Sequence, residues 1–229
     1  VPINEPALGN ALHGFARWMT WSVEETEPSS AVLSLLLYPR AGYPFALHNE
    51  IEYAVHPGGV NVAVTARNVG RTSLPYANGF HPYISAGSAR IDSCLLSISA
   101  ETWLRSDERQ IPIGRERIEG SGYDFRARRR IGSLQLDTAF TDLVRDQDGK
   151  ARVELVAGEG ERSVAVWMDP AYGYVMAYTG DKLDPTRRRS ALAVEPMTAA
   201  PNALRSGEGL RVLEPGETFR STWGIEIRK

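Results

Sequence analysis

The feature that most constrains this chain is a period of two in its apolar residues. In "TFRSTWGIEIRK" (218–229) one face of the repeat is apolar apart from Ser221, and its members are Phe219, Trp223, Ile225 and Ile227. "GGVNVAVTARNV" (58–69) alternates in the same way. Successive side chains of a β-strand point to opposite faces, so both segments are predicted to be strands with one buried face.

Shorter apolar runs add strands that we expect to pack on both sides: "AVLSLLLY" (31–38), "ARVELVA" (151–157) and "SVAVWM" (163–168). Turn-forming stretches such as "HPGG", "DQDGK" and "EPGE" separate the strand-like segments, and 21 Gly with 14 Pro leave little room for long helices. We expect at most short helices near "TAFTDLV" (138–144). The pattern therefore predicts an all-β protein, a sandwich or a barrel.

Length and charge describe an ordinary globular protein. All-β chains of 229 residues often form one domain, so a single domain over residues 1–229 is expected. A net charge of −2 gives no reason to expect a nucleic-acid partner. No apolar run approaches the roughly 18 residues of a membrane span. Cys94 is the only cysteine, which excludes an internal disulfide and favours a reducing compartment, so a cytoplasmic protein is expected.

Several kinds of catalytic site lack their sequence motif. The four histidines are His13, His48, His56 and His81, and none forms an HExxH or His-x-His pair, so local spacing gives no support for a metal centre. There is no Gly-x-Ser-x-Gly elbow, and Cys94 lies in the strand-like "SCLLSIS", where an inert buried thiol is expected. General acid–base chemistry remains.

Two residues suit that chemistry. Glu195 lies in the apolar run "ALAVEPM" (191–197), where burial is costly for a carboxylate unless it is paired or used in catalysis. His81 is followed by Pro82, which restricts it to extended backbone, and Gly79 allows close approach of the chain. Each residue taken alone is more often structural.

Six segments together resemble the aldose 1-epimerase (galactose mutarotase) family, in the family's order and over essentially the whole chain. They are "NEPALGNALHGFAR" (4–17), "NGFHPYI" (78–84), "GSLQLDTAFTDL" (132–143), "YVMAYTGD" (174–181), "LAVEPMTAAPNAL" (192–204) and "LEPGETFRSTWGI" (213–225). The resemblance implies a large antiparallel β-sandwich, called a supersandwich, and interconversion of the α and β anomers of an aldose without a cofactor or metal. A small sugar is then the expected partner of a monomer or homodimer.

The resemblance also implies roles for particular residues. Glu195 matches the general base that removes the proton from the C1 hydroxyl, and His81 matches the general acid that protonates the ring oxygen. His13 and Asp137 match residues that hold sugar hydroxyls, and Arg17 is a further candidate for substrate binding. Aromatic residues that could stack on a sugar are Trp18, Trp21, Tyr83 and Trp167.

Two departures from the family keep other functions open. The chain starts too late to contain the family's first strands and an arginine that contacts substrate, so we expect a domain that lacks the N-terminal strands. Met176 stands where many galactose mutarotases have a sugar-binding glutamine. The alternatives are a non-catalytic sugar-binding protein on the same fold, or another carbohydrate-active enzyme such as a lyase or hydrolase.

Two arginine-rich runs bear on the choice of sugar. "RARRR" (126–130) and "TRRRS" (186–190) are expected to be solvated loops, with an anionic ligand as the alternative. A phosphorylated aldose would need cations at the site, for which Arg17 and Arg187 to Arg189 are candidates. A neutral aldose is the favoured expectation.

Overall fold

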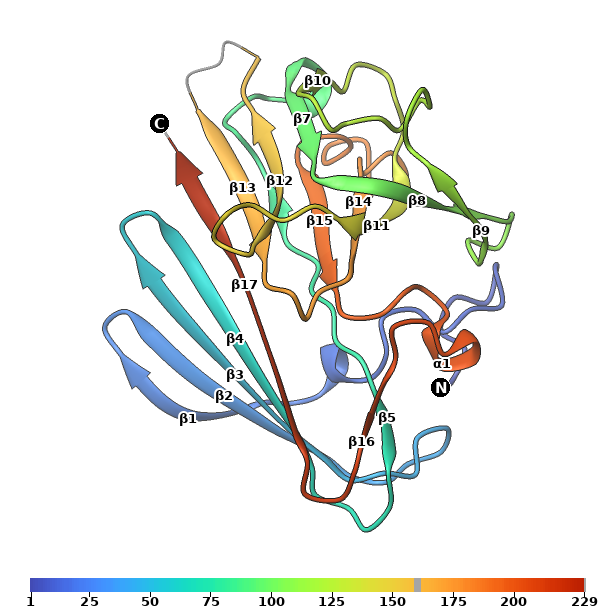
Figure 1. The fold of residues 1–229 in the computed structure, drawn as a ribbon. Coiled ribbons are helices and arrows are strands. Elements are labelled where there is room, and N and C mark those ends of the chain that lie inside the picture. Colours follow the sequence, from blue (N-terminus) through green and yellow to red (C-terminus); the bar gives the residue numbers. More distant parts are fainter. Residues whose placement is uncertain (159–161, 229) are drawn as a thin grey trace.

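Two large antiparallel sheets pack against each other in the computed structural model, which describes residues 1–158 and 162–228 (Figure 1). The larger sheet has nine strands in the order β1 (Ser22–Glu27), β2 (Ser30–Leu37), β3 (Leu47–His56), β4 (Gly59–Asn68), β17 (Thr218–Arg228), β13 (Ser163–Met168), β12 (Ala151–Val156), β7 (Leu95–Ile98) and β10 (Arg129–Arg130). The second sheet has six, in the order β6 (Tyr83–Ile84), β15 (Leu192–Met197), β14 (Tyr174–Tyr178), β11 (Asp137–Leu143), β8 (Ala100–Ser106) and β9 (Pro112–Arg117).

The remaining elements are short. β5 (Leu74–Tyr76) pairs with β16 (Arg211–Leu213), and the helices are η1 (Ala16–Trp18), η2 (Ile91–Ser93) and α1 (Ala203–Ser206). Neighbouring strands in both large sheets run antiparallel. The predicted all-β antiparallel sandwich is therefore confirmed. Among residues 1–158 and 162–228, no helix has the length and apolar content needed to cross a bilayer.

The two alternating segments of the sequence lie side by side in the larger sheet. β17 pairs with β4 so that Trp223 lies opposite Val62 and Ser221 opposite Val64. Ser221, the one polar member of its row, is 1% exposed, and its hydroxyl lies 3.2 Å from the Tyr172 hydroxyl. The hydrogen bond explains why an apolar face accepts a serine.

The main core lies between the two sheets. Its buried members include Val62, Val153 and Val166 from the larger sheet, and Phe140 and Val194 from the smaller one. Burial of such side chains contributes roughly 1.5–3 kcal/mol each, and this fixes which face of each sheet turns inward.

The prediction of a short helix near "TAFTDLV" is wrong. That segment is β11, which pairs with β14 on one side and with β8 on the other. Thr138, Ala139, Phe140 and Thr141 are all buried. A strand covered on both faces shows no polar alternation, so the period of two is absent from its sequence.

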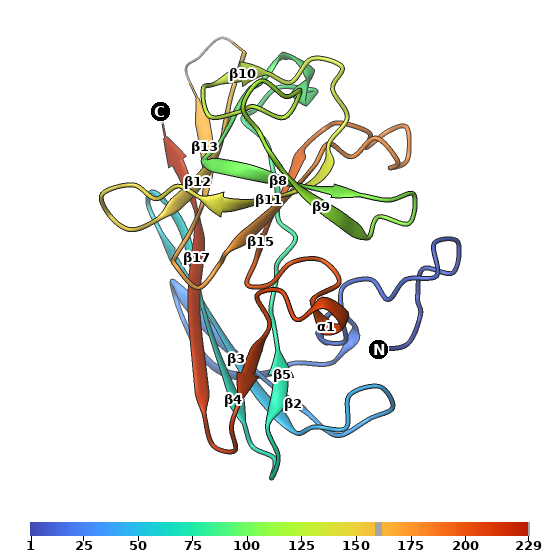
Figure 2. The same ribbon diagram turned by 45° about the vertical axis from the view of Figure 1, so that its right-hand side comes forward.

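The chain before β1 runs along the side of the smaller sheet. Figures 1 and 2 show this N-terminal segment, in blue, close to α1 in both views. It brings a stretch of irregular backbone next to strands that are distant in sequence.

Candidate active site

One face of the six-stranded sheet points away from the main core and carries polar residues. Leu192 and Val194 of β15 belong to the core, so Glu195 between Val194 and Pro196 points to the other face. Glu195 lies directly opposite Met176 of β14, and Tyr178, two residues further on, lies opposite Asp137 of β11. Directly paired residues share a face, so Glu195, Met176 and Asp137 look onto one surface.

His81 reaches this surface because its backbone follows β15. The Phe80 N–H donates to the carbonyl oxygen of Pro196 at 3.1 Å, and the Val194 N–H donates to that of Pro82 at 3.1 Å. The segment is thus held to β15 on both sides of His81.

Gly79 permits this approach. A Cβ atom added at Gly79 would lie 3.3 Å from Met197 Cγ and 3.3 Å from the Pro196 carbonyl oxygen, closer than ordinary van der Waals contact. The close approach predicted from Gly79 is confirmed.

His81 and Glu195 make the central contact of the site. His81 Nε2 lies 3.1 Å from Glu195 Oε1, and the two side chains are 31% and 12% exposed. Burial raises the pKa of Glu195 to about 8, helped by the negative charge of Asp137. Burial lowers the pKa of His81, and the charge of Arg17 acts in the same direction. A simple ion pair would shift both pKa values the other way, so the effect of burial dominates. Near neutral pH the two groups therefore hold one proton between them.

His13 comes from the N-terminal segment and lies against His81. The two ring centroids are 5.2 Å apart with an edge-on geometry. His13 has a φ of 62° and is followed by Gly14 at 59°, so two left-handed residues turn the chain here. Although His13 is open to solvent on one side, partial burial, His81 and Arg17 lower its pKa to about 4. The His13 ring is therefore neutral at pH 7.

Arg17 and Asp137 complete the set of residues expected from the sequence. Arg17 Nη1 lies 3.0 Å from His13 Nδ1. Asp137 Oδ2 lies 3.0 Å from Nζ of Lys182, and the hydrogen bond with Asp137 raises the pKa of Lys182. No sequence pattern points to Lys182, because an isolated lysine in a loop after a strand is common.

Of the aromatic candidates, Tyr83 is the one in contact with the acid–base pair. Its ring stacks on His81 with centroids 5.0 Å apart. Trp18 is 78% exposed, and its ring centroid lies 4.7 Å from the guanidinium carbon of Arg17. Trp167 is 5% exposed, and its ring centroid lies 3.8 Å from Nζ of Lys150. This ring contributes to packing on β13.

Two imidazoles and a carboxylate form a potential metal-binding group. Among the described residues, ligand atoms of His13, His81 and Glu195 lie within 4.8 Å of one another. Histidine ligands usually donate their second ring N–H to a carboxylate or carbonyl. At His13 the hydrogen bond runs the other way: Arg17 has only N–H donors, so it donates to Nδ1 of His13. A metal would have to displace either Arg17 or the ring proton, so the arrangement suits proton transfer better than metal binding.

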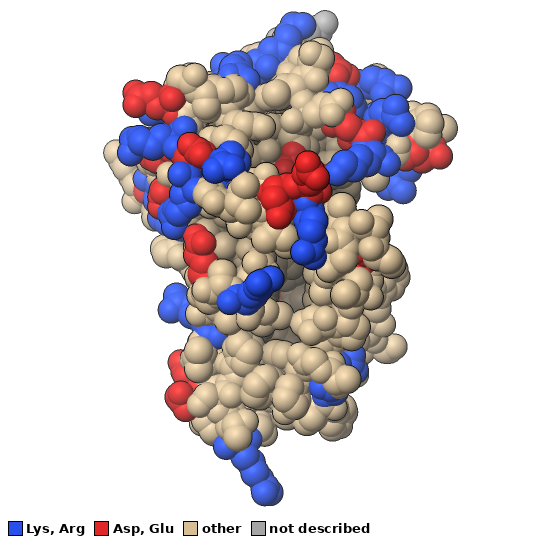
Figure 3. Space-filling view, turned by 90° about the vertical axis from the view of Figure 1, so that its right-hand side faces the viewer, with Lys and Arg blue, Asp and Glu red and all other residues tan. Residues whose placement is uncertain are grey.

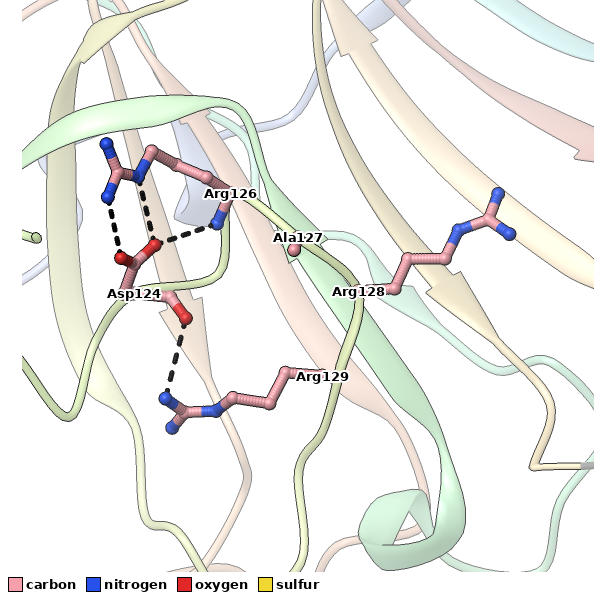
Figure 4. Close-up of a pocket in the computed structure, with 5 residues that line it drawn as sticks. All are labelled: Asp124, Arg126, Ala127, Arg128 and Arg129. Carbon is pink, nitrogen blue, oxygen red and sulfur yellow. Dashed lines mark hydrogen bonds and ion pairs between the residues drawn. The ribbon is translucent and has the colours of Figure 1, made fainter. Parts of the chain in front are cut away.

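The first arginine-rich run is engaged in internal contacts. The Asp124 carboxylate pairs with Arg126 at 2.8 Å, and the Asp124 carbonyl oxygen accepts from Arg129 at 3.4 Å; both contacts are drawn in Figure 4. Arg128 turns away and pairs with Glu154 at 2.8 Å. These residues line a pocket of ≈ 420 Å³, but Asp124 and Glu154 already neutralise part of its positive charge.

In the second run, the expectation that Arg189 could serve as a phosphate ligand is not supported. Its side chain, 10% exposed, pairs with Asp92 at 2.7 Å and Asp181 at 2.9 Å. Acidic and basic side chains are also interspersed on the face drawn in Figure 3. The charge of Arg187 lowers the pKa of Tyr83, against the larger effects of burial, Tyr178 and Glu195, which raise that pKa. Arg187 is therefore close enough to the site to influence it.

Known proteins resemble this chain over nearly its whole length. A family model described as aldose 1-epimerase matches residues 1–226. The uncharacterized protein YihR of Escherichia coli K12 is 29% identical over 98% of this chain and 70% of its own length.

Solved structures show the same fold. A galactose mutarotase-like protein from Clostridium acetobutylicum superposes with a TM-score of 0.81 at 18% identity, covering 100% of this chain and 72% of its own. A GalM/aldose epimerase homologue from C. elegans gives 0.81 at 17% identity, covering 92% and 69%. The family model, which spans both sheets and every candidate site residue, establishes that this chain belongs to the aldose 1-epimerase family.

Proposed function

We propose that the protein interconverts the α and β anomers of an aldose by opening and closing the sugar ring. The observation that carries the proposal is the 3.1 Å contact between His81 and Glu195, which hold one proton between them. O1 and O5 of a pyranose are bonded to the same carbon, so a proton must leave one oxygen and reach another oxygen beside it. An adjacent acid and base suit that requirement.

In ring opening, Glu195 takes the proton of the C1 hydroxyl while His81 gives its proton to O5. The C1–O5 bond breaks, its electron pair stays on O5, and C1 becomes a free aldehyde. Rotation about the C1–C2 bond then presents the other face of the aldehyde. In closure O5 attacks C1, His81 recovers the proton from O5, and Glu195 returns its proton to O1.

The electrostatics of the pair favour a reversible exchange. Near neutral pH the single proton of the pair lies mostly on Glu195. Ring opening starts from the other form, in which Glu195 is ionised and His81 is protonated, and it returns the pair to the neutral form that burial stabilises. Closure restores the charged form, so neither step leaves a net charge in the site. A positioned acid and base typically contribute about 10²–10⁴-fold each.

Binding of the sugar is assigned to the surrounding polar groups. His13 and Asp137 would hold hydroxyls, with Arg17 as a further contact and Lys182 keeping Asp137 in place at 3.0 Å. Met176 lies opposite Glu195 and offers no strong hydrogen bond, so the sugar contact of a glutamine at this position would be missing. We propose an aldohexose as the substrate without choosing galactose.

Two other functions remain as candidates. A non-catalytic sugar-binding protein would keep His13 and Asp137 as ligands but would not use the proton of the pair. A glycoside hydrolase would need a second carboxylate about 5–10 Å from Glu195. The candidate for that second carboxylate, Asp137, is engaged with Lys182.

Polarimetry on freshly dissolved α-glucose and α-galactose, run beside a glycan-cleavage assay, tests all three functions. The proposal expects mutarotation without cleavage, and a loss of orders of magnitude in Glu195→Gln and in His81→Asn. Normal rates in either variant would remove the mechanism. His13→Ala and Asp137→Ala should raise KM and lower kcat, because the hydrogen-bonding partners of the sugar hydroxyls are lost. Binding without turnover would identify a sugar-binding protein, and cleavage would identify a hydrolase or lyase.

A further inference from the structure

The contact between Arg17 and His13 limits how the His13 ring can be protonated. Arg17 Nη1 lies 3.0 Å from His13 Nδ1. A guanidinium carries only N–H donors and stays charged in proteins, so Nδ1 must accept the hydrogen bond. The His13 ring is neutral at pH 7, so its single proton must then be on Nε2.

The local backbone supports this contact. The left-handed residues His13 and Gly14 reverse the chain just before η1, which carries Arg17. The Trp18 ring lies 4.7 Å from the guanidinium carbon of Arg17, and such stacking favours a defined guanidinium position. Arg17 is therefore held by two contacts although it is exposed to solvent.

We propose that Arg17 is a positioning residue that locks His13 in the Nε2-protonated tautomer, so that His13 presents a hydrogen-bond donor to a sugar oxygen. As an inference about substrate binding it rests on the proposed function, whereas the tautomer itself does not. Histidine would otherwise populate both neutral tautomers in water, and only one of them donates from Nε2. The positive charge of Arg17 also keeps the ring from taking a second proton, in line with the lowered pKa of His13.

Nuclear magnetic resonance of ring ¹⁵N-labelled protein without sugar tests the tautomer directly. A ring with one fixed proton gives two well-separated nitrogen signals, whereas a mixture of tautomers gives averaged signals. The His13 signals can be assigned by their loss in His13→Asn. His56 is an internal control, because its Nδ1 accepts from the Gly58 backbone N–H at 3.2 Å and does not involve Arg17.

Three substitutions separate the hydrogen bond from the charge. Arg17→Met removes both, Arg17→Gln keeps an N–H donor without charge, and Arg17→Lys keeps donor and charge. We expect averaged His13 signals and a raised His13 pKa in Arg17→Met, a largely fixed tautomer with a raised pKa in Arg17→Gln, and both properties retained in Arg17→Lys. The signals of His56 should stay the same in all three.

Activity is the second readout. Loss of a residue that orients another typically costs on the order of tenfold to a hundredfold. We expect such a fall in kcat/KM for Arg17→Met, with partial recovery in Arg17→Gln and Arg17→Lys and an unchanged melting temperature. A His13 proton on Nδ1, or a fixed tautomer that persists in Arg17→Met, would overturn the proposal. If the tautomer responds as expected but wild type has no mutarotase activity, the role of Arg17 toward His13 stands and the proposed function fails.

Discussion

Replacement of Glu195 by glutamine should stabilise the protein while removing its activity. The pKa of Glu195 is raised from 4.5 to about 8 by burial, so in the folded state the carboxyl stays largely protonated at pH 7. In the unfolded chain the carboxyl ionises from pH 4.5 upward, and this ionisation stabilises the unfolded state by roughly 1.4 kcal/mol per pH unit. By pH 7 this favours unfolding by about 3 kcal/mol. Glutamine does not ionise and has nearly the same volume, so the variant avoids this loss.

Urea unfolding of wild type and Glu195→Gln from pH 4 to pH 9 measures the effect. The raised pKa means that the folded state binds the extra proton, so wild-type stability should fall as pH rises from about 4.5 to about 8. The difference between the two proteins should be small at pH 4 and grow to on the order of 3 kcal/mol at pH 7. A variant that is less stable than wild type at pH 7 would show that Glu195 and His81 form a stabilising ion pair, which would refute the reasoning.

Glu154 provides the matched control. It is as buried as Glu195, at 9% exposure, but it pairs with Arg128 at 2.8 Å. Glu154→Gln removes the negative partner of Arg128 and should lower the free energy of unfolding at pH 7. Opposite signs for the two substitutions would separate the effect of the site from a general effect of removing buried carboxylates.

Three further predictions concern the reaction. The mutarotation rate should fall as pH rises past about 8, where the Glu195–His81 pair loses its proton. Asp137→Asn removes a negative charge near Glu195 and should move this fall in rate to lower pH; a fall that stays at the same pH would exclude the coupling. Chelators should leave the rate unchanged, because Arg17 occupies Nδ1 of His13, and a loss that zinc restores would contradict this. Glucose should be anomerised at least as fast as glucose-6-phosphate, because Arg189 is engaged with two aspartates; a phosphate preference that collapses with added salt would reverse this choice.

The alternating strands could be predicted from the sequence because one of their faces is polar. β4 and β17 follow that rule, and their predicted rows meet in the structure. β11 does not, because it has buried residues on both faces. Periodicity identifies a strand by its contact with water, so it fails for strands that have little such contact.

The candidate site was only partly predictable. The apolar residues around Glu195 single it out in the sequence, and burial does raise its pKa. Its contact with His81 joins residues more than a hundred positions apart, and no local pattern encodes it. The roles of His13 and Asp137 came from the family resemblance and stay predictions. Lys182 and the Arg17–His13 contact depend on how loops fold back onto the sheet, which propensity does not determine.

The left-handed backbone of His13 has a consequence for engineering. A side chain with a Cβ atom at φ 62° costs roughly 1–2 kcal/mol relative to glycine. Selection for heat tolerance alone would therefore favour glycine at this position and would discard the imidazole. A library screened for survival at high temperature should be screened for sugar turnover in the same round, because otherwise its most stable members will be those that have lost the site.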